Sequence, residues 1–324
     1  MMYPLYRNRR LRTSAAMRDL VRETSLSAND FIVPLFIVEG SKTKAEIPSM
    51  PDYYRFSLDL ATVEAKRLYD LGVKGVLIFV KIDDSQKDNS GAAASNPDGL
   101  MQRSIRAIKK AVPELVVASD VALDPFSSFG HDGIVKNENV LNDATVAVLA
   151  KMALSHAECG ADIIAPSDMM DGRVLTIRQT LEKAGYVNTA IMSYSAKYAS
   201  AFYGPFRDAL DSAPGFGDKK TYQMDVANRK EAIVETVRDI EEGADIVMVK
   251  PGMAYLDIVR DLANEVQIPI AVYQVSGEYA MLKAAAEKGW IDHDSVMMEQ
   301  LIAFKRAGAS IIVSYHAARA ISLL

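Results

Sequence analysis

The sequence predicts a (β/α)8 (TIM) barrel with an extended N-terminal arm, which is an α/β protein built around a closed parallel sheet. Eight short runs rich in β-branched and other apolar residues recur along the chain, and amphipathic helical stretches separate them. Several of these stretches end in a glycine just before the next apolar run, as helix C-caps do. A repeated order of strand, helix and glycine that counts to eight is typical of a barrel.

The individual elements follow from the same signals. Each expected strand is a short apolar run, and the strands in chain order are 31–39, 73–80, 115–121, 162–166, 189–195, 245–249, 270–275 and 310–315. Each expected helix has an apolar face at helical spacing, and the helices include 57–71, 99–112, 143–159, 174–184, 229–242, 254–266, 278–288 and 295–307. The glycines that end helices are Gly72, Gly160, Gly185, Gly243 and Gly308.

A doubly wound sheet is the main alternative fold, because it also alternates strands with helices. A dinucleotide-binding sheet of that kind should carry Gly-x-Gly-x-x-Gly after its first strand, but residues 39–44 read EGSKTK. The length of 324 residues fits one barrel domain at 31–324 with two additions. These are an arm at 1–30 for subunit contacts and an active-site lid at about 198–222.

Composition and charge exclude several classes of function. The formal net charge of −5 argues against a general nucleic-acid-binding surface, and the local cluster of Arg7, Arg9, Arg10 and Arg12 is better interpreted as an arm for subunit contacts. No apolar run approaches the roughly 18 residues of a membrane span, and none has the form of a signal peptide, so we expect a cytoplasmic protein. The single cysteine, Cys159, excludes an intramolecular disulfide and a zinc site made of several thiolates.

Two lysines follow buried apolar runs and are the first candidates for catalysis. Lys250 ends one expected strand and is followed by Pro251-Gly252, and Lys197 follows another. Because the carboxyl ends of barrel strands face the active site, we expect both amines to share one pocket. Like-charge repulsion and burial would depress their pKa values and favour the unprotonated amine, which forms Schiff bases with ketones or aldehydes. A pair of such lysines suits a reaction that joins two carbonyl compounds.

Further polar residues lie at strand ends or in the lid. Arg207 and Lys219, with Lys220, are expected to bind a carboxylate or phosphate as the lid closes. Ser276 and Tyr315 could donate hydrogen bonds to a second carboxylate.

A third group of candidates is mostly acidic. Asp120, Asp124 and Asp132, with His131, could bind a hard cation such as Mg²⁺, or they could orient a substrate amine. Ser167 ends another expected strand. From the residues alone, the choice between a metal site and an amine site stays open.

Two other functions compete with this interpretation. A class I aldolase also uses a Schiff-base lysine in a barrel, but it does not need the second lysine. A non-catalytic, metal-responsive assembly protein could use the barrel as a scaffold and the arm for contacts. Such a protein would have no need for both lysines, the lid cations and the Ser276 and Tyr315 pair together.

With these residues in view, the chain resembles the porphobilinogen synthase family, also called δ-aminolevulinic acid dehydratases, over nearly its whole length. The resemblance depends on several specific motifs. They are 9–12 (RRLR), 31–36 (FIVPLF), 162–173 (DIIAPSDMMDGR), 192–198 (MSYSAKY), 248–251 (MVKP), 273–279 (YQVSGEY) and 313–316 (VSYH).

The resemblance implies the asymmetric condensation of two 5-aminolevulinate molecules to porphobilinogen with loss of two waters, early in tetrapyrrole synthesis. Lys250 would form the Schiff base with the first substrate and Lys197 with the second. Arg207 and Lys219 would hold one carboxylate, and Ser276 and Tyr315 the other. The remaining positions that match the family's substrate-binding residues are Asp120, Ser167 and Tyr273.

The resemblance also bears on metals and on assembly. Zinc-dependent members carry three cysteines where this chain has Ala122, Asp124 and Asp132, so we expect no catalytic zinc and at most weak Mg²⁺ binding at the two aspartates. The family's activating Mg²⁺ site rests on a glutamate that is present here as Glu235. Members of the family form octamers through the N-terminal arm, which implies a homo-octamer for this chain.

Overall fold

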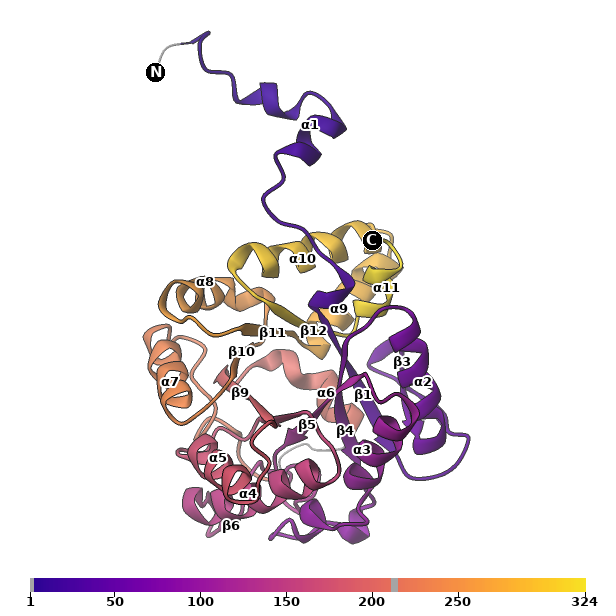
Figure 1. Cartoon of the computed structure of the whole chain (residues 1–324), viewed down its shortest axis with the longest axis vertical. Helices are drawn as coiled ribbons and strands as arrows, with labels where there is room; N and C mark the ends of the chain where they lie inside the picture. Colours follow the sequence, from indigo (N-terminus) through magenta and orange to yellow (C-terminus); the bar gives the residue numbers. More distant parts are fainter. Residues whose placement is uncertain (1–2, 211–214) are drawn as a thin grey trace.

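The fold is a closed parallel barrel of eight strands, as the sequence predicts (Figure 1). The computed structural model describes residues 3–210 and 215–324. Each strand pairs in parallel with the next, and the last strand pairs with the first, Phe31 opposite Ile312, which closes the barrel. The barrel strands are β1 (Phe31–Val38), β4 (Gly75–Lys81), β5 (Val116–Val121), β8 (Ile163–Pro166), β9 (Ala190–Lys197), β10 (Ile246–Lys250), β11 (Ile270–Gln274) and β12 (Ile311–Ser314).

Helices surround the barrel and return the chain from each strand to the start of the next (Figure 1). The larger ones are α2 (Leu58–Asp70), α3 (Leu100–Ala111), α4 (Asn142–Glu158), α5 (Arg173–Lys183), α7 (Lys230–Glu241), α8 (Leu256–Glu265), α9 (Ser276–Glu287) and α10 (His293–Ala307). Shorter helices are η1 (Asn8–Arg12), α1 (Ala15–Leu20), η2 (Ala28–Asp30), η3 (Asp84–Gln86), η4 (Ala92–Ser95), η5 (Ala201–Tyr203), α6 (Gly204–Leu210), η6 (Met253–Tyr255) and α11 (Ala317–Ile321).

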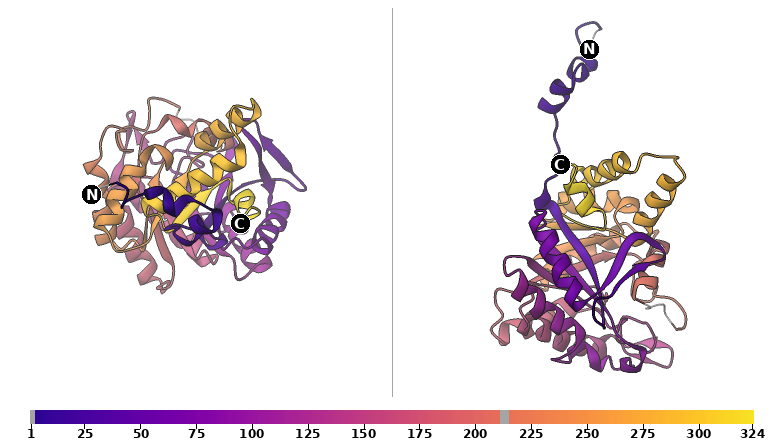
Figure 2. Two further views of the ribbon diagram at one scale, coloured as in Figure 1. Left: turned by 90° about the horizontal axis from the view of Figure 1, so that it is seen from above. Right: turned by 90° about the vertical axis from the view of Figure 1, so that its right-hand side faces the viewer.

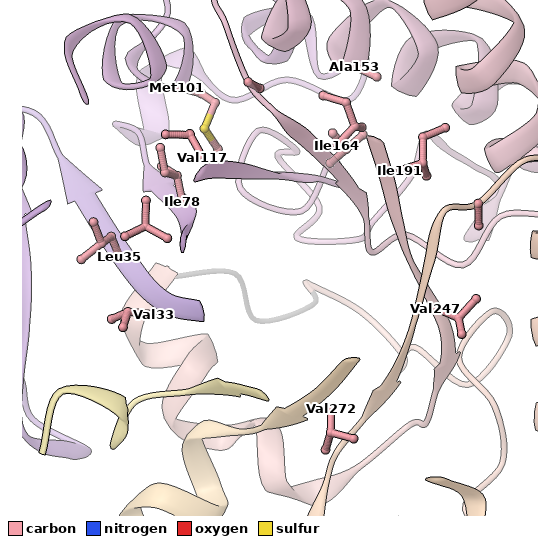
Figure 3. Close-up of a cluster of buried hydrophobic side chains, with 14 of the residues drawn as sticks. Val33, Leu35, Ile78, Met101, Val117, Ala153, Ile164, Ile191, Val247 and Val272 are labelled. Atoms are coloured by element: carbon pink, nitrogen blue, oxygen red, sulfur yellow. The ribbon is translucent and has the colours of Figure 1, made fainter. Parts of the chain in front are cut away.

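The core has two layers, because side chains alternate between the two faces of each barrel strand. Residues that face outward pack against the helices, and Figure 3 shows Met101 of α3 beside Val117 of β5, and Ala153 of α4 near Ile164 of β8. Residues that face inward fill the barrel and form a separate cluster that includes Phe36, Tyr194, Tyr273 and Tyr315. The interior is therefore packed with side chains, and only its carboxyl end is available for a site.

A hairpin between β1 and α2 is the main element that the sequence analysis missed. Its strands are β2 (Lys44–Ile47) and β3 (Met50–Ser57), which pair antiparallel to each other, and β3 also pairs in parallel with the end of β1. The hairpin strands mix charged, aromatic and aliphatic residues, and most of these residues are half-buried or exposed, so the strands lack the continuous apolar signal of the barrel strands. A second, shorter hairpin is formed by β6 (Val135–Lys136) and β7 (Asn139–Val140).

The expected lid is partly helical. It contains η5 and α6, and then an irregular segment from 215 to 222, while residues 211–214 of the expected range lie outside the described part of the chain. The sequence predicts a lid here and no helix, although η5 and α6 cover residues 201–210. The proline at position 205 is well tolerated in the first turn of a helix, where its missing N–H would have no partner.

The N-terminal arm projects away from the barrel, next to the chain's C-terminus (Figures 1 and 2). Of its expected range, 1–30, residues 1 and 2 lie outside the described part. Neither η1 nor α1 has a buried residue, and several large apolar side chains of the arm are exposed: Tyr3, Leu5, Tyr6, Leu11 and Leu20. Within residues 3–210 and 215–324, no helix has the length and hydropathy needed to cross a membrane.

Candidate active site

Lys197 and Lys250 lie side by side at the carboxyl ends of neighbouring strands. Lys197 is the last residue of β9 and Lys250 the last residue of β10, and their Cα atoms are direct partners in the register of the two strands. Both side chains are buried. The sequence analysis expected two amines in one pocket, and the register brings them together.

An irregularity in β9 turns Lys197 toward the barrel interior. Tyr194 belongs to the interior cluster, and a regular strand would direct the residue three positions later to the opposite face. The pairing with β10 shifts register between Ser193 and Ala196, and Ala196 packs in the outer layer. This bulge adds one residue to β9, so Tyr194 and Lys197 both point inward.

The amine of Lys250 lies among aromatic rings. Its Nζ is 4.7 Å from the ring centre of Tyr273, 4.9 Å from Phe206, 5.0 Å from Tyr194 and 5.2 Å from Tyr203. Aromatic faces stabilise a cation less well than water does, so the loss of hydration has the larger effect on the protonated amine. Burial, followed by repulsion from the Lys197 cation, lowers the pKa of Lys250 to about 7. A large fraction of this amine is therefore unprotonated near neutral pH.

Lys197 has a different environment, because it contacts carboxylates. Its Nζ lies 3.2 Å from Asp132 Oδ2, and it also donates a hydrogen bond to the carbonyl of Ser167. Lys219 lies 2.5 Å from the other oxygen of Asp132 and 3.4 Å from Asp124. Burial alone would raise the pKa of Asp132. The positive charges of Lys197 and Lys219 have a larger, opposite effect and hold the pKa of Asp132 below its usual range.

The aspartate loop therefore pairs with lysines in this structure. Asp124 and Asp132 were expected to be weak Mg²⁺ ligands at most, and both contact Lys219. Over the described ranges 3–210 and 215–324, no three His, Cys, Asp or Glu side chains are grouped so that they could hold a metal ion. Cys159 is buried on the outer layer at the end of α4, where Arg106 donates to its Sγ at 3.0 Å.

Asp120 is a buried carboxylate of the site with an unpaired oxygen. It belongs to β5, and the oxygen without a hydrogen-bond partner is Oδ1. Burial, followed by repulsion from Asp124, raises the pKa of Asp120 to about 7, although a hydrogen bond with Ser167 opposes that rise. A buried acceptor without a partner is costly unless a ligand supplies a donor, so Asp120 suits an amine of the substrate.

The proposed carboxylate-binding residues fall on opposite sides of the lysines. Ser276 is the first residue of α9, where its Oγ accepts the N–H of Phe206 at 2.9 Å and its own hydroxyl hydrogen stays available to a ligand. The hydroxyls of Tyr273 and Tyr315 lie 3.0 Å apart. Arg207 and Lys219 lie on the lid side, where they line a cavity of about 30 Å³ together with both active-site lysines.

Glu235 is the one candidate that lies apart from the lysines. It is half-buried on α7 and lines a separate polar cavity of about 820 Å³, together with His131, Asp171, Glu231 and residues of the lid segment. Burial, followed by repulsion from Asp239, raises the pKa of Glu235. Carboxylate oxygens are ligands of the kind that Mg²⁺ prefers, but the carboxylates that line this cavity do not form a three-ligand cluster within the described residues 3–210 and 215–324.

Sequence reasoning missed four residues that line the site: Tyr194, Tyr203, Phe206 and Gln223. The first three surround Lys250. Tyr203 and Phe206 are three residues apart in a segment that was interpreted as a loop, and helical spacing would have placed them on one face with Arg207. Tyr194 precedes Lys197 by three residues. In a regular strand this spacing would place the two side chains on opposite faces, so Tyr194 can be assigned to the site only when the bulge is known.

A barrel with two buried amines at adjoining strand ends defines an enzyme that forms lysine Schiff bases. The chain belongs to the delta-aminolevulinic acid dehydratase family, whose sequence profile matches residues 5–323. It is therefore a lyase of the 5-aminolevulinate dehydratase class, and the resemblance of its motifs to that family is confirmed.

Relatives and a solved structure agree with this assignment. The chain is 51% identical to the delta-aminolevulinic acid dehydratase of Bacillus subtilis over 96% of this chain and 95% of the relative. It is 54% identical to the Bradyrhizobium diazoefficiens enzyme over 97% of this chain and 89% of the relative. The crystal structure of the Toxoplasma gondii enzyme in complex with the reaction product porphobilinogen matches with a TM-score of 0.97 and 46% identity, covering 98% of this chain and 91% of that one.

The lowered pKa of Lys250 gives a pH prediction. A lysine whose pKa is lowered to about 7 gains free amine as the pH rises through 7 and is fully free above about 8. We expect the rate at which borohydride traps a keto acid on Lys250 to rise about tenfold per pH unit below 7 and to level off above 8. The measurement is the initial adduct yield at Lys250 by mass spectrometry.

Lys197→Met should move that midpoint upward, since it removes a neighbouring positive charge. Lys183→Met is the control, because Lys183 is exposed at the end of α5, outside the site, and it should leave the midpoint unchanged. A wild-type midpoint near the ordinary lysine value of about 10.4 would contradict the interpretation.

Proposed function

We propose that this chain condenses two molecules of 5-aminolevulinate asymmetrically to porphobilinogen, with loss of two waters, in tetrapyrrole synthesis. The observation that carries the proposal is the pairing of Lys197 with Lys250 in the register of β9 and β10. Two amines that are direct neighbours can hold two ketones side by side. Membership of the dehydratase family supports the same reaction.

The two lysines would act through imines. Each unprotonated amine attacks the ketone carbon of one substrate, and loss of water from the resulting carbinolamine gives a lysine imine. One carbon–carbon bond and one carbon–nitrogen bond then join the two substrates, and both lysines are released as free amines when the ring forms. Lys250 has the lowered pKa, so we assign it the first imine and Lys197 the second.

The positions of the other residues divide the pocket into two halves. Ser276 and Tyr315 follow β11 and β12, on the Lys250 side, and would bind the carboxylate of the substrate held there. Lys219 lies across Asp132 from Lys197, and with Arg207 it would bind the other carboxylate.

Three further residues complete the proposed site. Asp120 would accept a hydrogen bond from a substrate amine, and Ser167 would hold Asp120 and, through its carbonyl, Lys197. Tyr273 would orient the hydroxyl of Tyr315, to which it is hydrogen-bonded. Asp124 and Asp132 would hold Lys219 ready for the carboxylate instead of serving as catalytic metal ligands.

A magnesium-type enzyme fits this chain better than a zinc-type one. Zinc catalysis in this family would need thiolates, and the only cysteine is on the outer layer. Glu235, with the other oxygen donors of its cavity, would hold an activating Mg²⁺. Such an ion would neutralise the acidic cavity beside the lid segment and so favour the closed lid, an allosteric effect on the site.

The arm would join copies of the chain into a homo-octamer. Its large apolar side chains are exposed, and isolated apolar surface of this kind is normally covered in the assembled state. The arginines of the arm would complement the net negative charge of the remaining chain.

Borohydride trapping tests the function. We expect 5-aminolevulinate to leave a reduced adduct of its own mass at Lys250 in the wild type, and at Lys197 under conditions that load both substrates. Lys250→Met should lower kcat at least about 10⁴-fold, because it removes the nucleophile. Absence of any adduct at Lys250 would rule out the proposed chemistry.

The second lysine distinguishes this function from a class I aldolase. Lys197→Met should still be trapped at Lys250 but should form no porphobilinogen, since only one ketone is held covalently. Lys183→Met is again the control and should keep full activity. A Lys197→Met variant that still forms porphobilinogen at the wild-type rate would contradict the two-imine mechanism.

Metal dependence can be measured after chelation. We expect removal of divalent cations to reduce activity several-fold and Mg²⁺ to restore it, whereas Zn²⁺ alone should not. Glu235→Gln should abolish the response to Mg²⁺ while leaving trapping at Lys250 intact, and Glu265→Gln, a charge change at the end of α8, serves as the control. Rescue by Zn²⁺ alone would contradict the magnesium assignment.

Assembly can be measured by analytical ultracentrifugation. The full chain should sediment as an octamer, and a variant that lacks residues 1–24 should sediment as a smaller species, because the exposed apolar arm is gone. Trp290→Ala removes an equally exposed apolar side chain outside the arm and should not change the assembly. An octamer that persists without the arm would show that other surfaces hold the subunits together.

A further inference from the structure

Glu278 is a buried carboxylate that joins two loops of the active site. It lies on the first turn of α9 and is only 1% exposed. Its Oε1 accepts the N–H of Met253 at 2.6 Å, and its Oε2 accepts the N–H of Val275 at 2.8 Å and that of Gly252 at 3.4 Å. One side chain therefore holds the backbone of two different strand-end segments.

These two segments carry the two groups that would hold one substrate. Gly252 and Met253 follow Lys250 closely, and Val275 directly precedes Ser276. A hydrogen bond to a carboxylate is roughly twice as strong as one between neutral groups, and this one is shielded from water. Glu278 therefore fixes the position of the Lys250 loop relative to the Ser276 turn without reaching either functional group.

Besides the pairing of β10 with β9, two contacts to Lys250 and Ser276 come from the lid. Tyr203 donates to the carbonyl of Lys250 at 3.2 Å, and the N–H of Phe206 donates to Ser276 Oγ at 2.9 Å. Contacts of this kind change when a lid opens and closes. Glu278 belongs to α9, and its three hydrogen bonds go to residues outside the lid, so these bonds do not depend on a lid residue.

We propose that Glu278 is a positioning residue that determines substrate specificity, because it sets the distance between the Lys250 amine and the Ser276 hydroxyl. This inference rests on the proposed roles of those two residues. A keto acid held as an imine at one end and by its carboxylate at the other must match that distance. The site thus measures the number of carbons between ketone and carboxylate, and one additional methylene group would prevent one of the two contacts.

The substitution Glu278→Gln tests the proposal with little change of shape. Both carboxylate oxygens act as acceptors, so an amide group places an N–H donor against backbone N–H donors and loosens one of the two loops. Glu278→Asp keeps the charge but shortens the side chain, and it provides a second variant if the first does not fold. Folding of each variant is checked by circular dichroism and thermal unfolding.

The readout compares two keto acids that differ by one methylene group, 4-oxopentanoate and 5-oxohexanoate. Each is trapped by borohydride, and the rate of adduct formation at Lys250 is measured by mass spectrometry. In the wild type we expect a preference of about 10- to 200-fold for 4-oxopentanoate, the range that one methylene group confers. In a folded Glu278 variant we expect that preference to fall about tenfold.

The matched control is Asp292→Asn. Asp292 also accepts a backbone N–H at the start of a helix, from Ser295 at 2.8 Å, but it belongs to α10 and connects no active-site loop. It should leave the preference at the wild-type value.

An unchanged preference in folded Glu278→Gln and Glu278→Asp overturns the proposal, and so does an equal loss in Asp292→Asn. Absence of any wild-type adduct at Lys250 instead refutes the Schiff-base function itself, so the two failures are distinguishable.

Discussion

The placement of two amines at adjacent positions of a buried barrel edge is the constraint on which the rest of the site depends. Lys197 and Lys250 are register partners on β9 and β10, so their side chains leave the sheet at the same level. Two cations cannot share such a place without compensation, since burial and mutual repulsion both oppose the charged form. The remaining polar residues of the pocket offset the cost of burying two amines together.

The compensation is unequal, and the inequality gives the two lysines different properties. Lys197 lies against Asp132, whereas Lys250 lies among four aromatic rings. The surroundings of Lys250 favour its unprotonated, nucleophilic amine, whereas Lys197 is hydrogen-bonded to a carboxylate. A reaction that joins two identical molecules in an asymmetric way needs such a difference, because identical sites would give each substrate the same fate.

Much of the fold could be predicted from the sequence, because continuous apolar runs and glycine helix ends are local signals. All eight barrel strands lie where those signals occur, to within a few residues at their ends. The hairpin of β2 and β3 was missed because β3 pairs with β1 and β2 pairs with β3, so the order of both strands depends on tertiary contacts.

The site was predictable to the extent that residues follow strand ends. Lys197, Lys250 and Ser276 do so, and their proximity follows from the barrel. Tyr194 could not be found in this way, because a register shift against β10 decides where it points. The role of Glu278 could not be predicted from the sequence for a similar reason. Its hydrogen-bond partners lie at positions 252, 253 and 275, and no spacing in the sequence indicates these contacts.

The hydrogen bond from the N–H of Phe206 to Ser276 has a kinetic consequence. This bond joins α6 to the turn that would bind a substrate carboxylate, so in the proposed function a movement of α6 away from the barrel would also disturb the binding of that carboxylate. Release of the pyrrole product and opening of the lid would then occur together. In the proposed reaction, an intermediate would stay enclosed until the ring is complete, and the contact between Phe206 and Ser276 would help to set the residence time of the product.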